Sequence, residues 1–164
     1  MCLKLNEENA NAKIADHDII CYKLMHGFCD EYGNVGITSP YVGAMHPFNK
    51  TITAKGKVAK RNHHYKSGTL VKTIKEGVIH SYSTLEGAVD DMRNYCDGNV
   101  IFKAIIPKGT KYYVGYFAGT PSYGSKKLII TDTIASMDFL LKSPEGRMVS
   151  DYLFNNFKTE QPTE

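Results

Sequence analysis

The sequence has no long apolar run, and no part of it approaches the ~18–20 apolar residues that a membrane-spanning helix needs. Residues 1–17 also lack the apolar centre of a signal peptide. We therefore expect a soluble protein that is made in the cytoplasm and has no membrane partner. Its hydrophobic (42%) and charged (23%) fractions are those of an ordinary globular domain.

The four cysteines form no metal or redox motif, because none belongs to a C-x-x-C pair. Synthesis in the cytoplasm favours free thiols that act as small buried hydrophobic side chains. A disulfide between Cys21 and Cys29 across a hairpin is the alternative. Cys2 would become an N-terminal nucleophile after removal of Met1, but the polar residues that follow it lack the strand pattern such a nucleophile needs.

Acidic residues are missing from one segment, which carries all of the excess positive charge. Residues 50–75 contain eight basic side chains and no acid, so the net charge of +3 leaves −5 for the other residues. Clustered cations neutralise phosphates, and an interleaved Tyr65 stacks on bases. The pattern predicts an anionic macromolecular partner, either protein or nucleic acid, and a solvated loop is the alternative. The expected partner-binding residues are Lys55, Lys57, Lys60, Arg61 and Lys66.

Strands outnumber helices in the predicted secondary structure. Apolar or β-branched runs predict strands at 19–25, 51–53, 69–74, 78–82, 100–106, 111–117 and 127–134. Residues 27–47 and the basic stretch 54–68 are expected to be irregular, as is the loop that contains Gly119, Pro121 and Gly124.

Two helices are predicted from their caps. Ser83 and Glu86 form a capping box, and Gly98 is expected to end that helix in a left-handed conformation. Its apolar face comprises Leu85, Ala88, Val89 and Met92. A second helix begins at Ser143, followed by proline and an acid. Its packing face comprises Met148, Val149, Tyr152 and Leu153.

No alternating strand–helix–strand rhythm connects these elements. We therefore predict an α+β fold with a mixed or antiparallel sheet, one central capped helix and a C-terminal helix. The expected domain organisation is a polar N-terminal lead-in at 1–17, a single domain at 18–158 and a frayed tail at 159–164.

A polar trio, His80-Ser81-Tyr82, lies at the junction of a predicted strand and the first helix. Imidazole, hydroxyl and phenol groups bind a nucleotide by hydrogen bonds and stacking, and a helix N-terminus binds phosphate. The structural alternative is a half-buried, hydrogen-bonded His80 beside a helix cap.

Two other groups of side chains have a functional and a structural interpretation. His63 and His64 point to opposite faces of an extended chain, so no metal site is predicted there. Five aromatic residues either form a recognition face or pack in the core, and we expect core packing. They are Tyr112, Tyr113, Tyr116, Phe117 and Tyr123.

Several short motifs together resemble a group of small proteins from bacteriophages and from gut bacteria of the Bacteroides type. They are M-C-L-K, D-I-I-C-Y-K, T-S-P-Y, H-S-Y, A-I-I-P-K-G-T-K-Y-Y and Y-G-S-K-K-L, within residues 2–134. The resemblance implies a phage-type accessory protein in the bacterial or host cytoplasm or in the virion. It implies no enzymatic activity.

The order of elements is also loosely similar to the ADP-ribosyltransferase fold. In that family, residues on the first strand and at a second motif hold NAD, and a glutamate near the last strands activates the target. The resemblance would place Tyr22, His80 and Ser81 in a nicotinamide pocket as candidate catalytic residues. This chain departs from the pattern, because Lys23 replaces His or Arg and no glutamate lies between Glu86 and Glu145.

The sequence therefore favours a non-enzymatic accessory protein, without cofactor or metal, that uses its basic segment on an anionic partner. An NAD-dependent ADP-ribosyltransferase-like enzyme and a nucleic-acid-binding protein are the alternatives. The sequence does not determine the oligomeric state.

Overall fold

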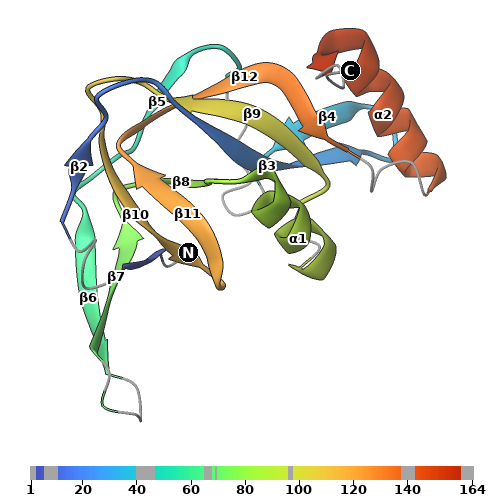
Figure 1. Ribbon diagram of the computed structural model, residues 1–164. Coiled ribbons are helices and arrows are strands. Elements are labelled where there is room, and N and C mark those ends of the chain that lie inside the picture. Colours follow the sequence, from blue (N-terminus) through green and yellow to red (C-terminus); the bar gives the residue numbers. More distant parts are fainter. Residues whose placement is uncertain are drawn as a thin grey trace.

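A computed structural model describes residues 3–5, 11–39, 47–64, 68, 70–95, 98–137 and 143–159 (Figure 1). The strands within them are β1 (Leu3–Leu5), β2 (Lys13–Ile14), β3 (Ile19–Cys29), β4 (Val35–Thr38), β5 (Thr51–Thr53), β6 (Ala59–His64), β7 (Leu70–Glu76), β8 (Ile79–Tyr82), β9 (Val100–Ile106), β10 (Lys111–Phe117), β11 (Thr120–Ser125), β12 (Lys127–Ser136) and β13 (Lys158–Thr159). The helices are α1 (Leu85–Tyr95) and α2 (Pro144–Asn156).

The strands form one sheet in the order β13-β12-β9-β3-β8-β11-β10-β1-β7-β6. Three short strands, β2, β4 and β5, pair with β10, β3 and β12. Every pairing among the described residues is antiparallel except that of β12 with β13. The predicted α+β class and its largely antiparallel sheet are therefore confirmed.

The two helices cover opposite faces of the sheet. Helix α1 buries Ala88 and Met92 against a cluster that includes Leu24, and helix α2 buries Val149 and Leu153 against a cluster that includes Met25. Adjacent residues of a strand point to opposite faces, so these two clusters lie on either side of β3. No helix in the described ranges is long and apolar enough to cross a membrane.

The predicted packing faces of the helices are only partly correct. On α1, Ala88 and Met92 are buried, with Leu85 and Val89 packed beside them. On α2, Met148 is 48% exposed, and its place in the packing face is taken by Gly146 and Ser150. The cap at Ser143 is confirmed, because its hydroxyl accepts a hydrogen bond of 3.0 Å from the Gly146 N–H.

The segment predicted as a polar lead-in contributes a strand inside the sheet. Strand β1 lies between β10 and β7, and its residues Leu3 and Leu5 are almost fully buried. They pack with Ile74 and Tyr113 in a third apolar cluster. Two leucines at alternating positions are enough to place this short strand in the sheet, because both neighbouring strands supply its backbone hydrogen-bond partners.

Two segments predicted as irregular are strands. Residues 59–64 of the basic stretch form β6, and the loop around Pro121 forms β11. A two-residue turn with positive φ at Ala118 (49°) and Gly119 (83°) joins β10 to β11. Positive φ at both central residues is the geometry of a type I′ hairpin, which aligns the strands without an apolar pattern in the second strand.

The ends of α1 also differ from the prediction. Thr84, not Ser83, caps the helix: its hydroxyl accepts a hydrogen bond of 3.1 Å from the Gly87 N–H. The Ser83 hydroxyl instead donates to the Pro121 carbonyl of β11. Gly98 does not have the predicted left-handed conformation. A residue without a side chain is needed there because a Cβ would lie 2.6 Å from the Leu24 Cγ.

Candidate functional site

The hairpin of β6 and β7 carries the centre of the basic segment, and we call residues 59–64 and 70–76 the basic ribbon. Its strands pair from Ala59 with Glu76 to His64 with Leu70, with a bulge before Lys60. Strand β6 is the outermost strand of the sheet. The ribbon extends from the body at one end of the molecule (Figure 1).

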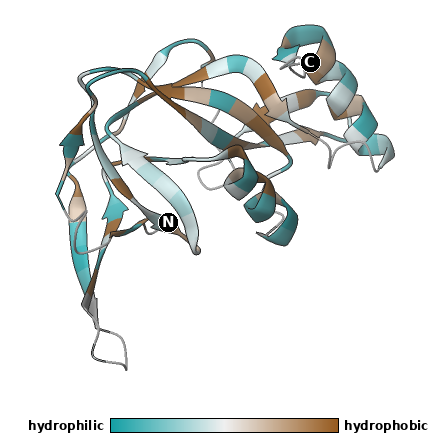
Figure 2. Cartoon of the chain, in the orientation of Figure 1, coloured by the Kyte–Doolittle hydropathy of each residue, from teal (hydrophilic) through white to brown (hydrophobic). Residues whose placement is uncertain are grey.

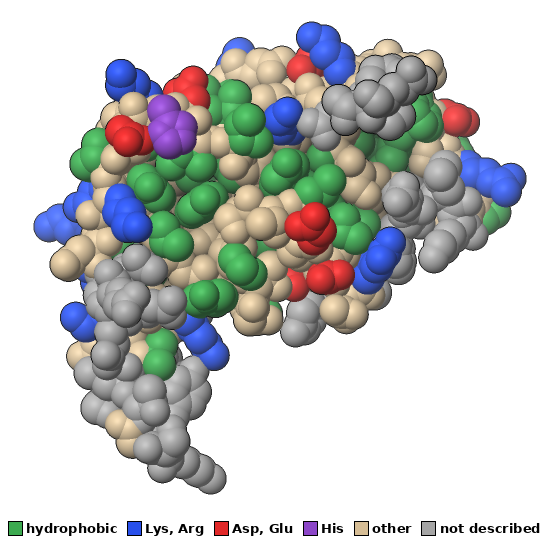
Figure 3. All heavy atoms as spheres, viewed as in Figure 1, with side chains coloured by type: hydrophobic (Ala, Val, Ile, Leu, Met, Phe, Trp, Pro, Cys, Tyr) green, Lys and Arg blue, Asp and Glu red, His purple; other side chains and the backbone are tan. Residues whose placement is uncertain are grey.

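Exposed cations line the ribbon and the loop that precedes it. They are Lys55, Lys57, Lys60, Arg61, Lys72 and Lys75. Figure 2 shows β6 as largely hydrophilic. In Figure 3, Lys and Arg side chains flank the ribbon where it leaves the body, and the acidic side chains on that face lie elsewhere. Such a patch attracts polyanions over a distance set by the salt concentration.

The base of the ribbon is held firmly on the sheet. The Lys126 ammonium donates hydrogen bonds of 2.9 Å to the carbonyls of Gly56 and Gly77, on either side of the ribbon. The Lys60 ammonium lies 5.1 Å from the centre of the Tyr113 ring. These contacts fix the direction in which the ribbon projects.

Some predicted residues of this segment lie outside the described part of the structure. These are Tyr65 and Lys66, as well as Cys2 near the N-terminus. The backbone of His63 and His64 belongs to β6. Among the described residues, no three His, Cys, Asp or Glu side chains are grouped to hold a metal ion.

The second candidate site, the His80-Ser81-Tyr82 trio, is buried: the three residues are 3%, 0% and 1% exposed. The His80 ring lies 4.7 Å from the rings of both Tyr82 and Phe117. Tyr22 is the register partner of Tyr82 and lies on the same face of the sheet as His80, whereas Ser81 points to the opposite face, so the structure brings together only two of the three candidate catalytic residues. A ligand would contact His80 only if the aromatic rings around it moved.

Lys23 is a charged residue next to this site to which the sequence alone assigned no role. Its buried ammonium donates a hydrogen bond of 2.7 Å to the His80 carbonyl. Burial lowers the pKa of Lys23 to about 8, and the nearby Cys21 thiolate opposes that shift. A single lysine within the apolar run 19–25 is the signal that could have identified it.

Burial also shifts the pKa values of two neighbouring groups, Cys21 and His80. Burial raises the pKa of the Cys21 thiol to about 11, with smaller opposing effects from Ser81 and Lys23. Burial, followed by the charge of Lys23, lowers the pKa of His80 well below 6.5. His80 is therefore neutral at pH 7. The Ser81 hydroxyl is buried beside the Cys21 thiol.

Lys23 connects two parts of the sheet. Strands β3 and β8 pair at a single position, where Tyr22 lies opposite Tyr82. The bond from Lys23 to the His80 carbonyl crosses this seam beside that pair. Because its amine is buried and engaged, the residue serves to join β3 and β8.

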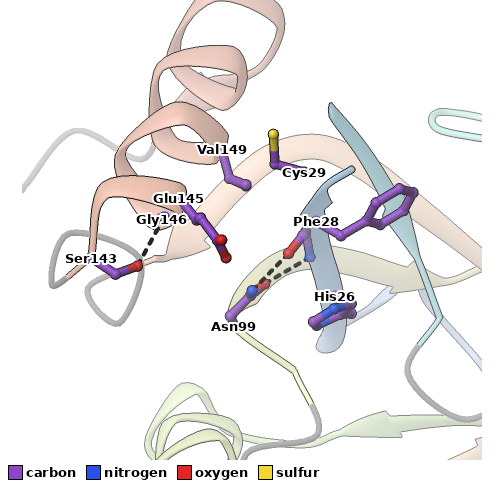
Figure 4. Close-up of a pocket in the computed structure, with 9 residues that line it drawn as sticks. His26, Phe28, Cys29, Asn99, Ser143, Glu145, Gly146 and Val149 are labelled. Atoms are coloured by element: carbon purple, nitrogen blue, oxygen red, sulfur yellow. Dashed lines mark hydrogen bonds between the residues drawn. The ribbon is translucent and has the colours of Figure 1, made fainter. Parts of the chain in front are cut away.

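A pocket of about 420 Å³ lies between β3 and the start of α2 (Figure 4). It is lined by His26, Gly27, Phe28, Cys29, Asn99, Ser143, Glu145, Gly146 and Val149. The Asn99 amide accepts from the Gly27 N–H at 2.7 Å and donates to the Gly27 carbonyl at 2.8 Å. It thereby continues the ladder of β9 along β3 by one more residue.

The pocket includes one cysteine, Cys29. Cys29 is a free thiol, as is Cys21, so the alternative disulfide between them is not formed. The Cys29 thiol donates to the Asp30 carbonyl at 3.6 Å. Figure 4 shows its sulfur directed away from both His26 and Glu145. Sequence reasoning did not identify this pocket, because its residues come from three separate segments.

Comparison with protein-family models, curated proteins and solved structures gave no match.

Proposed function

We propose that the protein is a non-enzymatic binding protein that uses the basic ribbon to contact an anionic macromolecule. One observation carries this proposal: six exposed cations lie on or beside a projecting hairpin, and the described part of residues 50–75 contains no acid. Like charges held this close repel one another. An anionic partner removes that cost when it binds.

The distribution of charge supports contact through the ribbon and not through the whole surface. Residues outside 50–75 have a net charge of −5. A polyanion is therefore attracted to one end of the molecule and repelled from the rest, which orients the encounter.

The resemblance to phage and Bacteroides-type proteins provides the proposed biological setting, that of an accessory protein. Such a protein is either a component of the virion or a factor that binds a host molecule in the cytoplasm. Mass spectrometry of purified phage particles distinguishes the two. Detection of the chain in particles supports the virion role, and its presence only in infected-cell lysate supports the host-factor role.

Binding of a defined polyanion tests the function itself. The wild-type chain should bind fluorescein-labelled heparin with an affinity that falls as salt is raised. The double variant Lys57→Glu, Lys60→Glu should lose this binding. Arg147→Glu on α2 is the matched control, because it removes the same kind of exposed charge from the opposite end of the molecule (Figure 1). Equal loss in both variants, or binding independent of salt, contradicts the proposal.

An ADP-ribosyltransferase-like enzyme is the second candidate. In its favour, Tyr22, His80 and Ser81 lie on the adjoining strands β3 and β8, and α1 follows β8 directly. The burial of His80 and Ser81 weighs against it. Calorimetry with millimolar NAD decides: binding that disappears in His80→Ala supports the enzyme, and no heat of binding rules it out.

A further inference from the structure

We infer that the anionic partner is a single-stranded nucleic acid, held on one face of the sheet by cations that contact its phosphates and a tyrosine that stacks on its bases. This inference rests on the proposed function and specifies the partner of the same site. It follows from the pairing of the strands beside the basic ribbon, which places an exposed aromatic ring in line with the cations.

Strand pairing sets five residues in one row across this end of the sheet. Arg61 of β6 pairs with Thr73 of β7, Thr73 with Lys4 of β1, Lys4 with Tyr116 of β10, and Tyr116 with Pro121 of β11. Residues that lie opposite one another in an antiparallel pair point to the same face. All five side chains therefore share one face, and we call them the cross-strand row.

The cross-strand row is open to solvent at two cations and at an aromatic ring. Arg61 and Lys4 are exposed and Tyr116 is 38% exposed, whereas Thr73, between the two cations, is buried. Neighbouring strands lie about 5 Å apart, so the ring is one strand away from Lys4 and three strands away from Arg61. A chain that lies across the strands meets the ring and then both cations.

The opposite face of the same strands belongs to the third apolar cluster. There Lys60 pairs with Ile74, and Lys72 pairs with Leu5, and both apolar partners are buried. The Lys60 ammonium lies over the ring of the buried Tyr113. The cross-strand row is therefore the face of this end on which an extended ligand can lie.

Tyr116 differs from the other aromatic residues of β10 and β11. Tyr113 and Phe117 pack in the third and second apolar clusters, and Tyr112 and Tyr123 pack against the first. Tyr116 is exposed beside a lysine instead. Unpaired bases stack on exposed aromatic rings while cations contact the phosphates. A duplex keeps its bases stacked inside and an acidic protein surface uses the cations alone, so the exposed ring favours an unpaired strand.

The test compares two polyanions, of which only one has bases. The full chain is titrated into fluorescein-labelled oligodeoxythymidylate and into labelled heparin, and affinity is measured by fluorescence anisotropy over a range of salt concentrations. An abasic oligonucleotide of the same length has the phosphates without the bases, and an oligouridylate distinguishes RNA from DNA as the source of the strand.

The variants remove or keep the ring. Tyr116→Leu removes it, and Tyr116→Phe keeps it. Tyr32→Leu is the matched control, because Tyr32 is 82% exposed in the turn between β3 and β4. Unfolding midpoints establish that each variant is folded.

We expect Tyr116→Leu to weaken oligothymidylate binding about tenfold and to leave heparin binding unchanged. Tyr116→Phe and Tyr32→Leu should bind both ligands as the wild type does. The wild type should bind the abasic oligonucleotide about as weakly as Tyr116→Leu binds the one with bases. Arg61→Ala should reduce the salt slope for the oligothymidylate by about 0.7.

Unchanged oligothymidylate binding in Tyr116→Leu, with heparin still bound, overturns the inference and leaves the proposed function intact. An equal loss of both ligands in that variant, or tighter binding once the oligothymidylate is paired with oligodeoxyadenylate, also overturns it. If Tyr116→Leu does not fold, the wild type decides, because equal binding of the abasic oligonucleotide and the oligothymidylate excludes stacking. If neither heparin nor an oligonucleotide binds the wild type, the inference and the proposed function are both wrong.

Discussion

The Lys23 ammonium donates a hydrogen bond of 2.7 Å to the backbone carbonyl of His80, across the seam where β3 meets β8. A buried lysine is costly to keep charged. The contact between these two parts of the sheet therefore depends on pH, because Lys23 holds its proton less firmly than an exposed lysine.

Stability should increase with pH above neutrality because of Lys23. Folding lowers the lysine pKa from 10.5 to about 8, so between these values the unfolded chain holds a proton that the folded protein has released. The free energy of unfolding should rise by up to about 1.4 kcal/mol per pH unit from pH 8. Folding raises the pKa of Cys21 from 9.0 to about 11, which lowers stability above pH 9 and offsets the rise. Urea denaturation should show a rise followed by a plateau.

Two variants separate these contributions. Lys23→Met should abolish the rise between pH 8 and 9, and Cys21→Ala should replace the plateau with a continued rise toward 10.5. A rise that persists in Lys23→Met shows that another group is responsible.

His80 should make the protein sensitive to acid. Its pKa in the folded state is well below 6.5, so stability is present above that value and is lost as the unfolded chain binds a proton at lower pH. His80→Phe keeps a ring against Tyr82 and Phe117 and removes a buried Nε2 that has no hydrogen-bond partner among the described residues. Between pH 6.5 and 5, the variant should lose less stability than the wild type, by up to about 1.4 kcal/mol per pH unit. Parallel losses in the two proteins would place the acid sensitivity elsewhere.

The cap of α1 predicts unequal effects at two neighbouring hydroxyl residues. Thr84→Ala removes the acceptor for the Gly87 N–H and should cost about 1 kcal/mol of unfolding free energy. Ser83→Ala removes an exposed hydrogen bond to the Pro121 carbonyl and should cost less than about 0.5 kcal/mol. Thermal unfolding of both variants checks the order, and the reverse order would restore Ser83 as the cap.

The Asn99 amide should be important for the end of β3. Asn99→Ala leaves the N–H and the carbonyl of Gly27 without partners, and we expect a loss of about 1–3 kcal/mol. The matched control is Asn156→Ala, which removes one exposed hydrogen bond to Tyr152 and should cost less than about 0.5 kcal/mol. Similar losses in urea titrations of both variants would mean that the amide pairing at Gly27 has no special role.

The sequence predicted the fold class because the strongest apolar runs become its central strands. Residues 100–106 form β9 as predicted, and the run at 19–25 forms the first part of β3. Strands β6 and β11 lack such a signal. Their positions depend on register with neighbouring strands and, for β11, on a turn that begins at a non-glycine residue, Ala118.

The candidate sites were predictable to different degrees. The charge of residues 50–75 is visible in the sequence, but the separation of Arg61 and Lys72 onto two faces depends on the pairing of β6 with β7. The burial of His80 could not be predicted locally. It results from Phe117, which lies 37 positions away along the chain and is brought close by the β10–β11 hairpin.

Amide hydrogen exchange in the presence of a polyanion shows whether the basic ribbon is the binding surface. Strand β6 is the edge of the sheet that the described residues form, so about half of its N–H groups have no strand partner within that sheet and should exchange quickly. Heparin should slow exchange at residues 59–62 and 71–75 and leave α2, residues 144–156, unchanged. Protection at α2, or no protection in the ribbon at saturating heparin, would contradict this role of the ribbon.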